Sequence, residues 1–234
     1  MTVLHLADEG EATDLVAFLS RLLHYDRGAA VRLQAAGTAL AVFGRPPSFE
    51  VLAVRAVRLA KPYENGLDAT LDVTVSAGEF LESVDDTAAT AAVPAAVTGP
   101  PWAGVLPPRG GWRAEPGLPL PEALRATVAA AVAEFRSRTR ELVPEQRTRA
   151  ALDRIGRDIW SREVGQTPLP VRAVHAAQSL GFLRPGAAPD GGREPAETPP
   201  ALLSSGAWLR LRTPYGSIAV RRAAGLGTFD LSVR

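Results

Sequence analysis

The first third of the chain passes from a helical to a strand-like spacing of apolar side chains. Between residues 13 and 25, apolar positions such as Leu15 and Phe18 recur every three or four residues, which predicts a helix with one buried face. Further on, apolar and polar residues alternate, as is typical of half-buried strands. We expect these strands over residues 31–34, 39–43, 49–59 and 71–76. Ser76 is placed to cap a short second helix that reaches Val84.

The second half returns to helical spacing and then to strands. Helices are predicted over 121–142, 145–163 and 170–180, and Gly181 stands where a glycine commonly ends a helix. A loop rich in Pro and Gly, residues 184–200, separates them from the next strands. Those strands are expected over 207–212, 217–222 and 229–233. The pattern leaves open whether they extend the first sheet or form their own.

Together these elements predict an α+β protein. An N-terminal helix plus an antiparallel four-stranded meander occupies residues 1–92, since short connections usually join neighbouring strands. Residues 121–234 hold a helical hairpin, a third helix and a C-terminal β-hairpin sheet. The segment between them, 93–120, is rich in Pro and Gly but also contains Trp102 and Trp112. Because a freely flexible linker should avoid tryptophan, we expect this segment to lie ordered against a domain surface.

Composition excludes several chemistries. The chain has no cysteine and only three histidines, and no two histidines have the spacing of a local zinc site, so we predict no metal and no cofactor. No apolar run approaches the length of a membrane-spanning helix, and the N-terminus lacks the pattern of a signal peptide. These features predict a cytoplasmic protein without a membrane partner.

Charge divides the chain unevenly. Residues 1–100 carry 7 basic and 13 acidic side chains, whereas residues 101–234 carry 19 basic and 12 acidic ones. This asymmetry indicates either attraction between the two parts or a polyanionic partner for the second part. Lys61 is the only lysine, against 25 arginines. Arginine is the better residue for phosphate recognition, but GC-rich coding also replaces lysine by arginine, and we favour that explanation.

Candidate catalytic groups each have a simpler structural explanation. The run His24-Tyr25-Asp26 is rich in acid–base groups, but it lies where the first helix ends. Asp85 and Asp86 have no second acidic motif that would complete a metal site. We therefore predict no catalytic residue. A small hydrolase remains a third hypothesis, which would need a pocket that joins Asp26, His24 and a serine.

The two long helices carry many arginines that could follow a phosphate backbone. Acidic residues stand four positions before several of these arginines, which is the arrangement of a solvated helix face that pairs with itself. We favour this second interpretation. The pairs are Glu134–Arg138, Glu145–Arg149, Asp153–Arg157 and Asp158–Arg162.

The third helix and the hairpin after it have the order of a winged helix, which suggests DNA or RNA binding. The alternation of Trp208 with Arg210 and Arg212 would place these three side chains on one strand face, suited to base stacking and phosphate contact. The candidate nucleic-acid-binding residues are Arg172, His175, Trp208, Arg210, Arg212, Arg221 and Arg222.

The leading hypothesis is instead a non-enzymatic interaction or regulatory protein. Its candidate partner-binding residues are Arg109, Trp112 and Arg113, in and beside the PPRGGW loop at 107–112. Arg and Trp are enriched among the residues that dominate binding at protein interfaces. The partner is expected to be another protein, with DNA or RNA as the alternative. The oligomeric state stays open.

Four short runs resemble a family of uncharacterised proteins from high-GC actinobacteria. They are PPRGGW at 107–112, ALDRI at 151–155, AAQSLGFL at 176–183 and PYG at 214–216. The resemblance covers most of the chain. It implies a cytoplasmic bacterial protein, and it transfers no catalytic or binding residue, because these runs carry no known chemistry.

Overall fold

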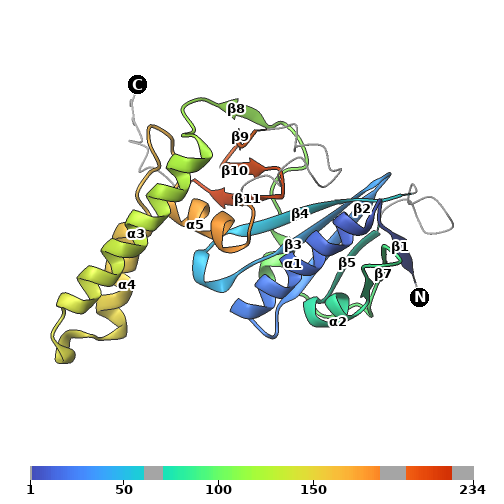
Figure 1. Cartoon of the computed structure of the whole chain (residues 1–234), viewed down its shortest axis with the longest axis horizontal. Helices are drawn as coiled ribbons and strands as arrows, with labels where there is room; N and C mark the ends of the chain where they lie inside the picture. Colours follow the sequence, from blue (N-terminus) through green and yellow to red (C-terminus); the bar gives the residue numbers. More distant parts are fainter. Residues whose placement is uncertain (1, 61–70, 185–198, 223–234) are drawn as a thin grey trace, which may run out of the picture.

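Strands from both halves of the chain build one antiparallel sheet (Figure 1). The computed structural model describes residues 2–60, 71–184 and 199–222. In these residues the sheet has eight strands, in the order β5-β2-β3-β4-β11-β10-β9-β8. Their bounds, in the same order, are Leu71–Ser76, Ala30–Ala36, Ala39–Gly44, Leu52–Arg58, Gly216–Arg221, Trp208–Thr213, Ala201–Ser205 and Arg113–Glu115. The α+β class is thus confirmed, and the end strands extend the first sheet.

Three helices cover one face of this sheet and enclose the main core. They are α1 (Glu9–Tyr25), α2 (Ala77–Glu82) and α5 (Val171–Ser179). The inward strand residues alternate with outward ones, so that Leu33 of β2 and Leu211 of β10 are fully buried. Phe18 of α1 stacks on Phe182, which follows α5, with 5.7 Å between ring centres. Each fully buried side chain of this size stabilises the fold by about 1.5–3 kcal/mol.

The helix α1 begins four residues before its predicted start. Asp8 caps it, because its Oδ1 accepts the backbone N–H of Glu11 at 2.9 Å. The third predicted strand is shorter than expected, since Phe49 closes a 3₁₀ turn, η1 (Pro47–Phe49). Glu50 then adopts a left-handed φ of 52°, and β4 starts only at Leu52.

The predicted meander is wrong for its fourth strand. β5 pairs with β2, at Val31↔Val75, and so lies at the edge of the sheet away from β4. The connection from Arg58 to Leu71 is much longer than a hairpin loop, and this length lets the chain return to the far edge. The place next to β4 is taken by β11, at Ile218↔Ala53.

A second, three-stranded sheet was not predicted. Its order is β1-β7-β6, with bounds Val3–His5, Thr90–Ala92 and Val84–Asp85. Strands of two or three residues are too short to show a period of two. Ser76 caps α2 as predicted, with its Oγ accepting the N–H of Glu79 at 3.4 Å. Ser83 ends the helix, so Val84 begins β6 instead of continuing α2.

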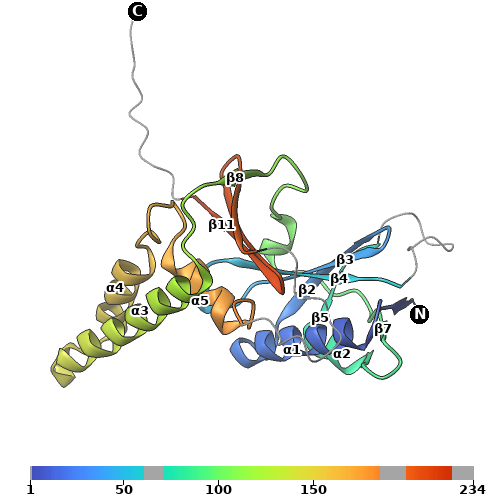
Figure 2. The same cartoon turned by 45° about the horizontal axis from the view of Figure 1, so that its top comes forward.

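The helices α3 (Pro121–Glu141) and α4 (Arg149–Trp160) form a hairpin that we call the arm, and Figures 1 and 2 show it projecting away from the sheet. α4 begins later than predicted. Pro144 starts a separate 3₁₀ turn, η3 (Pro144–Gln146), and Thr148 caps α4 by accepting the N–H of Ala151 at 3.2 Å. Gly181 follows α5 with a φ of 77°, as its predicted capping position requires.

The first part of the segment 93–120 crosses the outer face of the sheet, opposite α1, and its later part joins the sheet as β8. The backbone N–H of Val97 donates to the carbonyl of Thr74 at 2.9 Å, and Arg32 Nη1 donates to the carbonyl of Ala103 at 2.9 Å. The segment includes the 3₁₀ turn η2 (Pro101–Gly104). Figure 2 shows β11 rising steeply from the plane of β3 and β4, with this green segment in the angle between them.

Two sequence predictions lie outside the described residues. They are the strand at 229–233 and most of the loop at 184–200.

Candidate functional site

The outer face of β10 presents a tryptophan and two arginines in a row. Along this strand Trp208, Arg210 and Arg212 are half-buried, whereas Leu209 and Leu211 between them point into the core and are fully buried. The alternation predicted from the sequence is therefore present. Arg221 stands opposite Trp208 on β11, and its guanidinium lies 5.2 Å from the centre of the Trp208 indole.

Arg210 and Arg212 have no counter-charge among the described residues. Neither forms an ion pair there, and the Nε atom of each is buried without a hydrogen-bond partner. Burial, and then the positive charge of Arg212, lower the pKa of Arg210 below its usual value. An arginine stays protonated even so. Two cations thus lie close together with part of their donor capacity unused.

The PPRGGW loop adjoins these arginines. Its conformation is held from within, because Trp112 Nε1 donates to the carbonyl of Pro108 at 3.0 Å. Ser205 Oγ of β9 donates to the carbonyl of Gly110 at 3.3 Å, which fixes the loop to the sheet. The Trp112 indole then lies 5.8 Å from the guanidinium of Arg210. We call Trp112, Trp208, Arg210, Arg212 and Arg221 the arginine–tryptophan face.

Other predicted residues lie apart from this face. Arg109 is 75% exposed and reaches Asp72 of β5 at 4.0 Å. Arg113 belongs to β8, where its neighbour Ala114 pairs with Leu203, which in turn pairs with Arg210. Ala114 therefore shares the face of Arg210, and Arg113 points to the opposite face of the sheet. Its side chain is exposed.

Arg222 is engaged by a carboxylate, since its Nη2 lies 2.6 Å from Glu115 Oε1. Arg172 and His175 lie on α5, which packs on the opposite face of the sheet. The hairpin of β10 and β11 is enclosed between β4 and β9 and cannot act as a free wing. The winged-helix arrangement is therefore not formed, and its helix and hairpin residues do not make one surface.

His175 instead lies in a groove between the arm and the loop that carries η1. It stacks on Trp160 of α4 with 4.7 Å between ring centres and meets Phe49 edge-on at 5.0 Å. Burial lowers the pKa of His175, which keeps the imidazole neutral at pH 7. The open space beside these rings is about 920 Å³, and we call it the arm groove.

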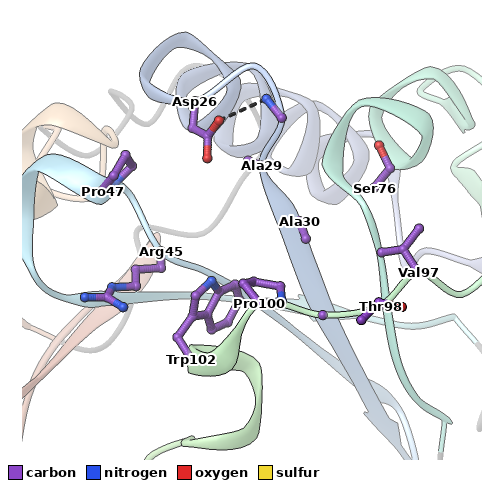
Figure 3. Close-up of a pocket in the computed structure, with 12 residues that line it drawn as sticks. Asp26, Ala29, Ala30, Arg45, Pro47, Ser76, Val97, Thr98, Pro100 and Trp102 are labelled. Carbon is purple, nitrogen blue, oxygen red and sulfur yellow. Dashed lines mark hydrogen bonds between the residues drawn. The ribbon is translucent and has the colours of Figure 1, made fainter.

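A second open groove, of about 640 Å³, lies between the end of α1 and the segment 93–120. Figure 3 shows Asp26 on one side of it and Arg45 and Trp102 on the other. Ser76 also lines the groove, but His24 does not. Asp26 Oδ1 accepts the N–H of Gly28 at 2.9 Å, and Ser76 caps α2. Both side chains thus have structural tasks, and the acid, base and nucleophile that a hydrolase needs do not converge here.

A buried cluster of charges was missed by the sequence analysis. Arg55 of β4 is 4% exposed, and its Nη2 donates to Glu11 Oε2 at 2.7 Å and to Asp14 Oδ2 at 3.3 Å. Its Nη1 donates to the carbonyl of Tyr215 at 2.9 Å, and Arg184 pairs with Asp14 from the other side. One sequence feature could have shown it: Glu11 falls on the buried stripe of α1, four positions before Leu15.

The arm holds four charged residues in a network: Glu134, Arg138, Asp158 and Arg162. The predicted pairs Glu134–Arg138 and Asp158–Arg162 form at 3.3 and 3.2 Å. Arg162 also bridges to Glu134 on the other helix at 2.6 Å, and Arg138 bridges to Asp158. The charges of Arg138 and Arg162 are therefore neutralised by carboxylates of the same network.

The other two predicted arm pairs are absent from the described structure. Glu145 lies in η3, before α4 begins, so it does not stand one turn from Arg149. Asp153 is approached by Arg149 at 3.8 Å rather than by Arg157.

No group of three His, Cys, Asp or Glu side chains that could hold a metal ion occurs within the described ranges. None of the helices in the described part of the chain has the length and apolar character needed to cross a lipid bilayer.

Comparison with known families divides the chain near residue 105. Residues 107–225 match the domain of unknown function DUF8185, which covers just over half of the chain. This chain belongs to the DUF8185 family. Residues 1–104 match a second domain of unknown function, DUF8010. No curated protein matches the chain.

The DUF8185 part contains every residue of the arginine–tryptophan face. The other features combine both parts. In the arm groove, Phe49 comes from the DUF8010 part, and Trp160 and His175 come from the DUF8185 part. The buried charge cluster likewise joins Arg55 of the first part to Arg184 of the second.

Proposed function

We propose that this DUF8185 protein acts by binding rather than by catalysis, and that the arginine–tryptophan face and the PPRGGW loop dock a partner that carries negative charge. The observation behind the proposal is the pair Arg210 and Arg212, which have no counter-charge among the described residues. A carboxylate or phosphate brought by a partner would accept hydrogen bonds from both guanidinium groups, in the bidentate manner that arginine favours.

The two tryptophans support a binding role for the same face. Trp112 and Trp208 are half-buried, so each indole keeps part of its surface open beside an arginine. Large rigid rings next to arginines are typical of the residues that dominate binding energy at protein interfaces. An acidic segment of another protein fits this arrangement best.

Single-stranded nucleic acid is the second candidate. It is favoured by the position of the Trp208 ring beside Arg210 and Arg212 on one strand face, because bases stack on such rings while arginines follow the phosphates. The winged-helix mode is not part of this candidate, since α5 lies on the other side of the sheet.

Affinity capture with the full chain as bait tests the proposal. One bait carries Arg210→Gln and Arg212→Gln, and its control carries Arg136→Gln and Arg154→Gln, two exposed arm arginines without ion pairs in the described structure. Both baits lose the same charge. We expect partners that the wild-type and control baits retain and the first variant loses. Nuclease treatment of the lysate separates the protein candidate from the nucleic-acid candidate.

Equal capture by all three baits would overturn the proposal. For a nucleic-acid partner, binding should weaken steeply between about 50 and 200 mM salt, as phosphate contacts require.

A further inference from the structure

The arm groove contains an unbroken row of aromatic rings. Tyr25 meets Phe49 with 5.3 Å between ring centres, and Phe49 meets His175 at 5.0 Å. His175 stacks on Trp160 at 4.7 Å, and Trp160 lies 6.0 Å from Phe135. The row runs from the end of α1 through η1 and α5 to the arm, and all five rings line the groove as its aromatic floor.

Guanidinium groups stand at the edge of this floor. Arg149 and Arg157 come from α4 and Arg172 from α5. Arg149 is engaged by Asp153 at 3.8 Å, whereas Arg157 and Arg172 form no ion pair with any described residue. The Nε atom of Arg172 is buried without a hydrogen-bond partner. Glu50 is the other carboxylate of the groove, and it is exposed.

We propose that the arm groove is a binding site for a small aromatic anion: a flat ring that carries a phosphate or a carboxylate group. The ring packs against the aromatic floor, and the anionic group accepts hydrogen bonds from Arg157 and Arg172. The volume of about 920 Å³ falls within the range of roughly 300–1,000 Å³ that is typical of ligand sites lined by aromatic side chains and a few polar groups.

This site is independent of the proposed docking face. α5, which supplies Arg172 and His175, packs on one side of the sheet, and Arg210 and Arg212 lie on the other side. Failure of one proposal therefore leaves the other standing.

The charges of the groove favour an anion over a cation. An aromatic surface alone attracts cations as well, through the faces of its rings. Here three guanidinium groups face two carboxylates, and one of those carboxylates is already engaged by Arg149. A cationic ligand would meet Arg157 and Arg172 without compensation, whereas an anion supplies the counter-charge that both lack.

Calorimetric titration of the full chain tests the site with two probes. Adenosine monophosphate presents a ring with a phosphate, and indole-3-acetate presents a ring with a carboxylate. Adenosine, indole and inorganic phosphate serve as controls that carry only the ring or only the anion. We expect at least one probe to bind ten times more tightly than its neutral ring and than phosphate alone. The probe that binds identifies the anionic group.

The combined variant Arg157→Gln and Arg172→Gln should weaken that binding at least tenfold. The control variant Arg136→Gln and Arg154→Gln removes the same charge from the arm, outside the groove lining, and should bind as the wild type does. Thermal melting checks that both variants are folded. If the first variant fails to fold, nuclear magnetic resonance of the wild-type protein still tests the site. A ligand bound in the groove must shift the indole N–H resonance of Trp160, and the variant Trp160→Phe assigns that resonance.

Three results would overturn the proposal. They are no saturable binding of either probe at millimolar concentration, equal affinity for a probe and its neutral ring, and binding that the groove variant leaves unchanged.

Discussion

Replacing Arg55 by methionine probes the buried charge cluster most directly. The change removes three hydrogen bonds, two to the carboxylates of Glu11 and Asp14 and one to the carbonyl of Tyr215. It leaves two carboxylates in a region where Glu11 is 5% and Asp14 is 7% exposed. Breaking a buried ion pair from one side typically costs 3–5 kcal/mol, because the remaining charge stays buried without compensation.

The structure places the expected loss near the lower end of that range. Arg58 Nε still donates to Glu11 Oε1 at 2.9 Å, and Arg184 still pairs with Asp14. We therefore expect Arg55→Met to lower the free energy of unfolding by about 3 kcal/mol. Urea unfolding followed by circular dichroism measures this quantity as a fall in the midpoint at constant slope.

Two further variants separate charge from packing. Arg58→Met is the matched control, because Arg58 is 67% exposed and its loss should cost less than about 1 kcal/mol. Adding Glu11→Gln and Asp14→Asn to Arg55→Met removes the two buried carboxylate charges that Arg55 no longer balances, so the triple variant should be more stable than Arg55→Met alone. A loss below about 1 kcal/mol in Arg55→Met, or a triple variant less stable than it, would refute the reasoning.

Three other changes have defined outcomes. Gly216→Ala would bring a Cβ within 2.5 Å of the Phe182 ring, so unfolding measurements should show a loss of about 1–3 kcal/mol. Glu50→Gly relieves a left-handed backbone, with φ of 52°, and should raise stability by about 1 kcal/mol in the same assay. The guanidinium of Arg162 lowers the pKa of Glu134 below its ordinary value of 4.5. The stability that this contact gives is fully present above pH 4.5 and is lost as the pH falls through the lowered pKa. The variant Glu134→Gln should therefore lose this pH dependence when the free energy of unfolding is measured across that pH range.

The sequence predicted those helices and strands whose burial pattern can be read from the spacing of apolar residues within one segment. α1 has an apolar stripe with Leu15 and Phe18, and β10 alternates arginine with leucine, so both could be placed from local spacing. The exposed row on β10 could be predicted for the same reason, because side chains two apart on a strand share a face. These predictions depend on contacts within one segment and not on the rest of the fold.

What the sequence did not predict depends on contacts between distant segments. Only the completed sheet shows that β5 returns to β2 and leaves the edge of β4 to β11, which is more than 150 residues away. The charge cluster is of the same kind, since Arg55 meets Glu11 only after β4 and α1 have packed. The arm groove needs Phe49 and Trp160, which lie more than 100 residues apart. Local periodicity contains no information about such pairings.

The junction of β4 and β11 joins the two family parts in one sheet. Their strands pair at Ile218↔Ala53, and the side chains on the core side of this junction belong to a single apolar cluster. Arg55 lies beside the junction and donates across it to the carbonyl of Tyr215. If the chain were cut near residue 105, β4 would keep β3 but lose β11 from its other edge, and Arg55 would be exposed with Glu11. Each half would therefore present an unpaired strand edge and an uncovered core, which is the surface that the other half supplies.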